Sequence, residues 1–413
     1  MKHIQRIFIA IAAITIIIGT QTQTFAQETA PKYKIVGYYT SYSIYTRQYF
    51  VTDIPANQLT HLNYAALDVS DNGQCVTSDL WADMQYSYPS DKPAERLRGN
   101  FKQLQLLKKA NPNLKILMTV GGWEQSKNFS NAALTQQSRI RFGRSCVAFM
   151  KEYGFDGIDI DWRYPVSGGL VENSGHPEDR ENFTLLLAEL RGQLEYWSQR
   201  DNTRYLLTIA APAVAPLFKN MQLDQIHPYV DWINLTAYGF QGDWSDLASH
   251  QAPLFGSVKD PRGDTIRNDY NVAGAVKAYL DAGVPAEKIV VGVPFFAQAW
   301  RNVKPNDYFG LYQTPGGVPT GTRPGGILYY RDLLPLLKSD SYTHFFDTET
   351  KTPWMYNANG GIAISYEDPN SIQNKAAYVM STGLGGIMIW ELDFDDDTHT
   401  LLNAVYTGLN PKP

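Results

Sequence analysis

Short apolar runs alternate with longer amphipathic segments along almost the whole chain. The β-type runs, which predict strands, cover residues 35–42, 59–69, 115–121, 157–164, 205–211, 231–240, 288–296 and 386–392. Several are apolar almost without interruption, such as Ile-Val-Val-Gly-Val at 289–293, as expected for parallel strands that are covered on both faces. Helical spacing of apolar positions lies between them, for example over 101–110, 182–197 and 272–282. Eight strands with intervening helices predict an α/β fold, a (β/α)8 TIM barrel, in preference to an open doubly wound sheet.

One interval interrupts this alternation. From about residue 300 to residue 362 the chain is rich in Gly, Pro, Tyr and Thr and contains short β-type pieces, such as residues 327–330. Such a stretch is too long for a plain loop, so we predict a small α+β insertion between the last two barrel strands. It would emerge at the carboxyl ends of the strands, where it could wall a cleft.

The amino-terminal 26 residues differ from the rest of the chain. Lys2 and Arg6 precede an apolar run over residues 7–18, and a polar stretch then ends in Thr-Phe-Ala at 24–26. A run this short predicts a cleaved signal peptide over 1–26, because a membrane span needs about 20 apolar residues. We therefore expect the mature domain, residues 27–413, to be secreted or periplasmic and without a membrane anchor after cleavage.

Charge and composition limit the classes of partner and cofactor that the protein could bind. The 413 residues carry a formal net charge of −5, which leaves no basic surface for nucleic acid. No spacing of ligands predicts a metal site, and no glycine-rich fingerprint predicts a nucleotide, so we expect no cofactor. Cys75 and Cys146 are the two cysteines. One disulfide is compatible with export, but Cys146 falls on an apolar helical stripe within 139–153, which favours a buried, unpaired thiol.

Residues 155–165, Phe-Asp-Gly-Ile-Asp-Ile-Asp-Trp-Arg-Tyr-Pro, form the most informative segment. Side chains alternate along a strand, so Asp159, Asp161 and Arg163 share one face, toward the barrel interior or its mouth. Ile158, Ile160 and Trp162 take the opposite face, under the helices. Acids inside a barrel cost desolvation energy, which favours a functional origin, and neighbouring acids can share a proton.

This segment resembles the Asp-x-x-Asp-x-Asp-x-Glu signature of family 18 chitinases, beginning at Asp156 and matched except at its last position, Arg163. The resemblance covers nearly the whole mature chain. Further matching segments lie at residues 36–39, 119–123 (Thr-Val-Gly-Gly-Trp), 234–238, 292–295 and 386–391. By this resemblance Asp161 orients the substrate acetamido group, Asp159 supports it, and Tyr238 holds the acetamido oxygen.

The resemblance implies hydrolysis of β-1,4-N-acetylglucosamine polymers by substrate-assisted catalysis, in which the signature Glu protonates the leaving oxygen. Arg163 cannot replace that acid, because a guanidinium keeps its protons at any working pH. An ion pair between Arg163 and Asp161 or Asp159, filling the site, is the expected local chemistry. We therefore predict a chitinase-like protein without hydrolytic activity.

Other positions of the family pattern also differ. The family's Asp after Tyr238 is Gly239, its Asn-Tyr-Ala-Phe ends in Ala66, and its Tyr-Gly-Arg ends in Gln298. Its Gly-Thr-Trp-Glu in the insertion reads Gly-Thr-Arg-Pro at 321–324. These differences gather at expected cleft positions, which points to relaxed selection on hydrolysis.

Aromatic residues survive at positions that resemble sugar-stacking sites, namely Trp123, Trp244 and Trp390. Three hypotheses stay open. The first is an inactive chitinase-like protein that keeps binding to chitin or chito-oligosaccharides. The second is an active but atypical chitinase with another acid, such as Glu124 or Glu391. The third is an interaction scaffold or inhibitor with a protein partner.

Overall fold

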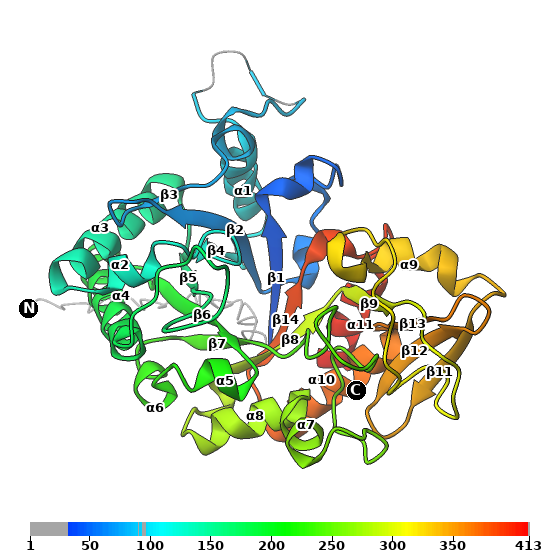
Figure 1. Ribbon diagram of the computed structural model, residues 1–413. Coiled ribbons are helices and arrows are strands. Elements are labelled where there is room, and N and C mark those ends of the chain that lie inside the picture. The colour runs from blue at the N-terminus through cyan, green and yellow to red at the C-terminus, as the bar shows by residue number, and fades with distance from the viewer. Residues whose placement is uncertain (1–31, 90, 93–95, 412–413) are drawn as a thin grey trace, which may run out of the picture. The chain divides into compact units, whose positions relative to one another are not determined.

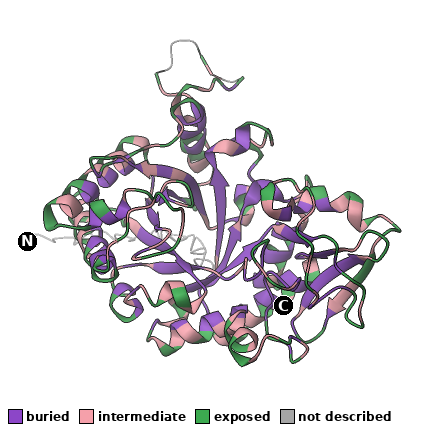
Figure 2. Ribbon diagram, in the orientation of Figure 1, coloured by how far each residue is buried: buried purple, intermediate pink, exposed green. Residues whose placement is uncertain are grey.

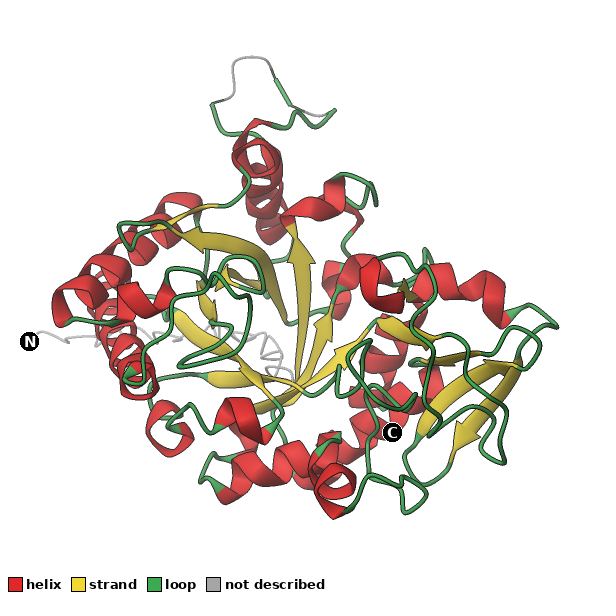
Figure 3. Cartoon of the chain, viewed as in Figure 1, coloured by secondary structure: helices red, strands yellow, loops and turns green. Residues whose placement is uncertain are grey.

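The computed structural model describes residues 32–89, 91–92 and 96–411, so the predicted signal peptide at 1–26 lies outside the described residues. Within residues 33–411, eight parallel strands form a closed sheet surrounded by helices (Figures 1 and 3). The barrel closes because β1 pairs with both β2 and β14. The predicted (β/α)8 barrel is confirmed. Its strands are β1 (Lys34–Thr40), β2 (His61–Val69), β4 (Lys115–Gly121), β5 (Gly157–Asp161), β6 (Leu206–Pro212), β7 (Trp232–Thr236), β8 (Ile289–Pro294) and β14 (Gly386–Trp390).

The helices pack outside the barrel, and their ends follow local sequence signals. Thr135 and Ser138 form a capping box at the start of α3, which ends at Gly154 in the left-handed conformation. Asp368 caps α10 in the same way. The helices are α1 (Gly99–Ala110), α2 (Phe129–Ala133), α3 (Gln136–Tyr153), α4 (Asp179–Asp201), α5 (Ala215–Phe218), α6 (Leu223–Ile226), α7 (Asp264–Asp269), α8 (Val272–Asp281), α9 (Tyr330–Leu337), α10 (Pro369–Thr382) and α11 (Thr400–Leu409).

Single turns complete the connections. They are the 3-10 turns η1 (Ser41–Ile44), η2 (Val51–Asp53), η3 (Ala56–Gln58), η5 (Ala286–Lys288), η6 (Pro324–Gly326) and η7 (Leu392–Phe394), and the π-turn η4 (Trp81–Gln85).

The buried residues form two layers, one inside the barrel and one between the barrel and its helices (Figure 2). The inner layer is small and rich in large side chains: Val36, Tyr38, Ala65, Leu117, Trp232, Val290 and Met388. The outer layer takes the alternate strand residues, including Ile158 and Ile160, both fully buried. Period-2 alternation along the strands therefore separates the interior from the helix-covered face.

An insertion with its own sheet lies between β8 and β14. Its antiparallel strands run in the order β10-β9-β13-β12-β11. Their bounds are β9 (Phe296–Trp300), β10 (Ile327–Tyr329), β11 (Thr343–Asp347), β12 (Thr352–Asn357) and β13 (Ile362–Ser365), with α9 between β10 and β11. The sheet begins at Phe296, two residues after β8. The apolar pattern had placed Phe296 at the end of the barrel strand, so this residue belongs to the insertion instead.

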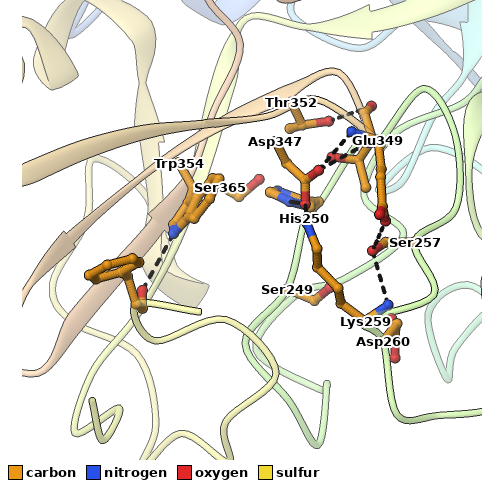
Figure 4. A network of polar contacts seen from close by, with 12 residues as sticks. Ser249, His250, Ser257, Lys259, Asp260, Asp347, Glu349, Thr352, Trp354 and Ser365 are labelled. Atoms are coloured by element: carbon orange, nitrogen blue, oxygen red, sulfur yellow. Dashed lines mark hydrogen bonds and ion pairs between the residues drawn. The ribbon is translucent and has the colours of Figure 1, made fainter. Parts of the chain in front are cut away.

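Polar contacts fix the insertion to the long loop that follows β7 (Figure 4). Asp347, at the end of β11, lies 3.9 Å from Nε2 of the buried His250 and 3.7 Å from Nζ of Lys259. The Ser257 hydroxyl donates a hydrogen bond of 2.6 Å to Glu349. Because burial lowers the pKa of His250, Lys259 supplies the positive charge opposite Asp347 at neutral pH.

A disulfide joins Cys75 to Cys146, so the expectation of an unpaired Cys146 is wrong. The helical stripe does bury Cys146, as predicted. The pairing depends on β3 (Cys75–Thr77), a short strand antiparallel to the end of β2. It brings Cys75 against α3, with the two Cα atoms 5.0 Å apart, within the range for a disulfide. The sequence pattern did not reveal β3.

No helix among the described residues has the length and apolar character that crossing a membrane requires.

Candidate functional site

Strand β5 carries two aspartates into the barrel, and the deeper one is Asp159. Its side chain is fully buried and accepts four hydrogen bonds. Oδ2 accepts from the hydroxyls of Tyr38 (2.7 Å) and Thr119 (3.0 Å). Oδ1 accepts from the hydroxyl of Thr208 (2.6 Å) and the amide of Asn234 (3.2 Å). Strands on both sides of β5 and across the barrel therefore hold this carboxylate in one position.

Burial raises the pKa of Asp159 to about 6. The hydrogen bonds from Thr208 and Tyr38 lower it again in part, and the charge of Asp161 raises it further. Asp159 can therefore take up a proton under mildly acidic conditions, although its four donors leave it no freedom to reorient.

Asp161, two residues along the same strand face, is paired with Arg163. Nε of Arg163 donates to Oδ1 of Asp161 at 2.8 Å, and Nη2 donates to Oδ2 at 3.0 Å. Only 18% of the Arg163 side chain and 5% of the Asp161 side chain are exposed. The predicted ion pair is confirmed, and its partner is Asp161. Because both carboxylate oxygens are engaged, a ligand must compete with the guanidinium for either of them.

The scaffold also fixes the backbone of Arg163. Its amide N–H donates to the Ser126 hydroxyl at 2.9 Å, and its carbonyl accepts from the Asn173 side chain at 2.9 Å. Strand β5 ends at Asp161, three residues before the predicted end, so the arginine belongs to the loop above the strand. The ion pair is therefore held from the loop as well as from the barrel.

Aromatic side chains surround this pair. The Trp390 ring lies 6.0 Å from the guanidinium carbon of Arg163 and 5.3 Å from the ring of Tyr38. The buried hydroxyl of Tyr238 has no hydrogen-bond partner within the described part of the chain. We call Asp159, Asp161, Arg163, Tyr238 and Trp390 the central site. The Tyr238 hydroxyl is the one buried donor atom of this set without a partner, and it is free to bind a ligand acceptor.

Two other tryptophans lie at the ends of barrel strands and face solvent. Trp123 is 49% exposed and follows β4 through Gly121 and Gly122. Both glycines have positive φ, and a Cβ atom on Gly121 would lie 2.3 Å from the carbonyl oxygen of Asp161. Trp244 is 70% exposed and lies against Gly242. Exposed indole faces of this kind suit contact with a pyranose ring.

A second cluster lies beside Trp390, on the side of the insertion. Glu391 is fully buried and accepts a hydrogen bond of 2.6 Å from the Tyr42 hydroxyl. Arg323 lies over the Tyr42 ring, 4.6 Å from its centroid, and donates to the Tyr329 hydroxyl at 2.6 Å. Burial raises the pKa of Glu391 well above its ordinary value, with a further contribution from Asp393. Glu391 is thus a candidate acid by its raised pKa, yet none of its surface reaches solvent.

The positions at which the sequence differs from the family pattern have different surroundings. Gly239 has a φ of +65°, and a Cβ atom there would meet no other atom within 4 Å, so the space for a side chain is still open. Gln298 is buried and its amide donates to the carbonyls of Gly325 (2.7 Å) and Ala299 (3.1 Å). It thereby holds the η6 turn, directly after Arg323. Ala66 is half-buried beside the inner layer.

Asp156 lies outside the central site. It precedes β5, at the amino end of the strand, where its carboxylate accepts from the backbone N–H of Ile116 at 2.9 Å. It also forms an ion pair of 2.8 Å with Lys108. This first aspartate of the signature segment joins β5 to β4 and α1. Among the described residues, no cluster of His, Cys, Asp and Glu could hold a metal ion.

Sequence reasoning did not find Tyr42 or the role of Gln298. Tyr42 is separated from Glu391 by most of the chain, and only the pairing of β1 with β14 brings them together. Arg323 was identified as a replaced position, but its stacking on Tyr42 depends on the fold of the insertion.

A (β/α)8 barrel with paired aspartates on its fourth strand and tryptophans at the strand ends defines a glycosidase-type barrel. Residues 34–395 match the family described as glycosyl hydrolases family 18, and the chain belongs to that family. Chitinase A1 of Niallia circulans is 39% identical over 420 residues, which cover 94% of this chain and 60% of that protein. Endochitinase 1 of Metarhizium robertsii is 34% identical, over 93% of this chain and 88% of its own length.

Solved structures agree with this assignment. Chitinase ChiA74 from Bacillus thuringiensis superimposes with a TM-score of 0.87 at 33% identity, over 92% of this chain and 70% of that one. The catalytic domain of the psychrophilic chitinase B from Arthrobacter TAD20 gives a TM-score of 0.85 at 28% identity, over 93% of this chain and 97% of that one. The protein is therefore a chitinase-like member of family 18.

Proposed function

We propose that this protein is an exported, chitinase-like binding protein that has lost hydrolysis. It would bind β-1,4-linked N-acetylglucosamine oligosaccharides without cleaving them. The observation that carries the proposal is the ion pair between Arg163 and Asp161, which engages both oxygens of the one central aspartate above Asp159.

The chemistry of the central site supports the loss of hydrolysis. A general acid must present a proton to the leaving oxygen, and this step contributes about 10²–10⁴-fold to the rate. Arg163 occupies the position of that acid and keeps its protons, while Asp159 is enclosed by four donors. The pKa of Glu391 is raised by burial, but its side chain is fully buried and bonded to Tyr42. Glu124 is exposed, beyond Trp123.

Retained binding is supported by the groups that remain available. Trp123 and Trp244 expose their rings, and Trp390 is only partly buried. The Tyr238 hydroxyl needs an acceptor, which the carbonyl of an acetamido group would supply. The relatives named as chitinases make an N-acetylglucosamine polymer the first ligand to test.

Export is supported by two features. The apolar segment at 7–18 with its preceding basic residues is typical of a signal peptide. The disulfide between Cys75 and Cys146 is typical of oxidising compartments.

Hydrolysis and binding are tested separately. Purified wild-type protein and its Asp161→Ala variant are incubated with a fluorogenic chitobioside, and we expect no release above the uncatalysed rate from either. Release by the wild type that Asp161→Ala abolishes would refute the loss of hydrolysis. Calorimetry with chitotetraose to chitohexaose then measures binding. An absence of heat throughout the series would refute oligosaccharide binding and favour a protein-interaction role.

A further inference from the structure

Arg323 is a half-buried cation that forms no ion pair within the described residues, although the charge of Glu391 acts on it. Its guanidinium lies over the Tyr42 ring at 4.6 Å and uses Nε for the Tyr329 hydroxyl. No carboxylate among the described residues comes within ion-pair distance of it, whereas Arg163 pairs with Asp161 and Arg47 with Asp393. Its two terminal nitrogens therefore keep hydrogen-bond donors that the protein does not use.

The position of Arg323 is held from two sides. Gln298 donates to the carbonyl of Gly325 in the η6 turn, which begins at the next residue, Pro324. Tyr42, beneath the guanidinium, is itself fixed by its hydrogen bond to Glu391. A planar guanidinium that is stacked and oriented in this way loses little freedom when it binds an anion.

Contacts connect Arg323 to the central site. Tyr42 bonds to Glu391, Glu391 follows Trp390, and Trp390 lies beside Arg163. A chain molecule that covers Trp390 and extends over Tyr42 would come near both Arg163 and Arg323. Glu391 is fully buried, and burial raises its pKa well above the ordinary value, although the charge of Arg323 lowers it in part.

The replaced positions shift the local charge mostly in one direction. Arg163 and Pro324 stand where the family pattern has Glu, Gly239 where it has Asp, and Arg323 where it has Trp. Gln298, in place of an Arg, is the single change of opposite sign. A ligand that carries negative charge would suit the resulting local charge.

We propose that the preferred ligand is a β-1,4-linked N-acetylhexosamine glycan that carries carboxylates, and that Arg323 binds one of them. The sugar with the carboxylate would lie on the insertion side of Trp390, against Tyr42. This inference rests on the proposed glycan binding and specifies its ligand. A lactyl ether on the sugar and a uronic acid unit are the two sources of such a carboxylate. The lactyl ether fits better, because it leaves an all-β-1,4 N-acetylhexosamine backbone intact.

The test compares two tetrasaccharides with the same backbone. Affinities are measured by calorimetry for chitotetraose and for a tetrasaccharide of alternating N-acetylglucosamine and N-acetylmuramic acid, at 50 mM and 500 mM NaCl. We expect the carboxylated ligand to bind about tenfold tighter at low salt, with the preference shrinking at high salt. Arg323→Met should bring the two affinities within about twofold, and Arg323→Lys should keep part of the preference.

A matched control removes a positive charge elsewhere on the insertion. Lys338, exposed after α9, is changed to Met, and the preference should persist. A hyaluronan tetrasaccharide distinguishes the sources: binding as tight as that of the muramic acid ligand would show that a uronate serves equally.

The outcomes separate the two proposals. Equal affinity of the wild type for both tetrasaccharides, or a preference unchanged in Arg323→Met, would overturn the role of Arg323 while leaving glycan binding in place. Hydrolysis of the chitobioside would overturn the proposed function without touching this comparison. Binding of neither tetrasaccharide would refute both glycan binding and its anionic specificity.

Discussion

Asp161, the last residue of β5, and Arg163, in the loop that follows, form a two-point ion pair of 2.8 and 3.0 Å. The family signature places two acids at these positions, whose like charges repel and favour a held proton. Here the two side chains carry opposite charges, and the guanidinium engages both oxygens of the carboxylate.

The ion pair should contribute to stability. We expect Arg163→Met to lower the free energy of unfolding by about 3 kcal/mol, because it leaves Asp161 buried without a counter-charge. The double variant Arg163→Met with Asp161→Asn should recover part of the loss. Denaturant unfolding of the two single variants and the double variant measures the coupling. Additive losses would show that the pair is not energetically coupled.

Restoring the acid should restore some hydrolysis. In Arg163→Glu with Gly239→Asp, Asp161 is released from its ion pair, and the aspartate enters open space at a φ of +65° that Asp tolerates. We expect chitobioside hydrolysis at least about 10²-fold above the wild-type background. Arg163→Gln with Gly239→Asp is the matched control, since it removes the cation without supplying an acid, and should stay at background. A restored variant no better than this control would mean that Ala66, Gln298 and Arg323 block turnover.

Asp159 should make stability depend on pH. Its pKa is about 6 in the folded protein and about 4 in the unfolded chain, so the folded state binds the extra proton between these values. Stability from this group is therefore present at about pH 4 and is lost as the pH rises through 6, a change of about 3 kcal/mol. Asp159→Asn should remove this component. Unfolding free energies of both proteins at intervals from pH 4 to 7 test it, and parallel curves would contradict it.

The disulfide should stabilise the fold by restricting the unfolded chain. Cys75 and Cys146 are 71 residues apart, and a loop of that size corresponds to about 4 kcal/mol. We expect Cys75→Ser with Cys146→Ser to lower the free energy of unfolding by about that amount, while a reductant should destabilise only the wild type. Thiol titration under denaturing conditions provides the control, since the oxidised wild type should show no free thiol.

The exposed tryptophans should affect binding more than folding. Trp244, 70% exposed, has little buried area to lose, so Trp244→Ala should leave the unfolding midpoint nearly unchanged. We expect its affinity for chitohexaose to fall about three- to tenfold through lost stacking. Tyr196→Ala, which removes a half-exposed aromatic from α4, is a suitable comparison and should bind as the wild type does. Equal binding by all three proteins would exclude Trp244 from the ligand surface.

The barrel and the β5 face were predictable from the sequence because both depend on local periodicity. Alternation placed Asp159 and Asp161 opposite Ile158 and Ile160, and the structure has them so. The ion pair was predicted from the same alternation and from the opposite charges of arginine and aspartate. Strand ends were less predictable: β5 stops at Asp161 because its ladder with β4 ends there, which the residue pattern does not encode.

Features that depend on distant contacts could not be predicted. The disulfide required β3, a three-residue strand with too few positions to show a period. The contact of Tyr42 with Glu391 joins opposite ends of the chain. Asp156 belongs to the signature segment but lies at the amino end of β5, whereas the central site lies at the carboxyl end of that strand. Membership in the segment therefore does not by itself place a residue at the site.

Gln298 bears on how such a barrel could regain its chemistry. Its amide satisfies two backbone carbonyls and lies close to Gly326, where an added Cβ atom would be only 3.2 Å from the amide nitrogen. Reverting it to the longer, charged arginine would disturb the turn that now supports Arg323. A side chain can be added at Gly239 without moving any neighbouring atom. A larger residue at position 298 would instead require the η6 turn and Arg323 to move with it.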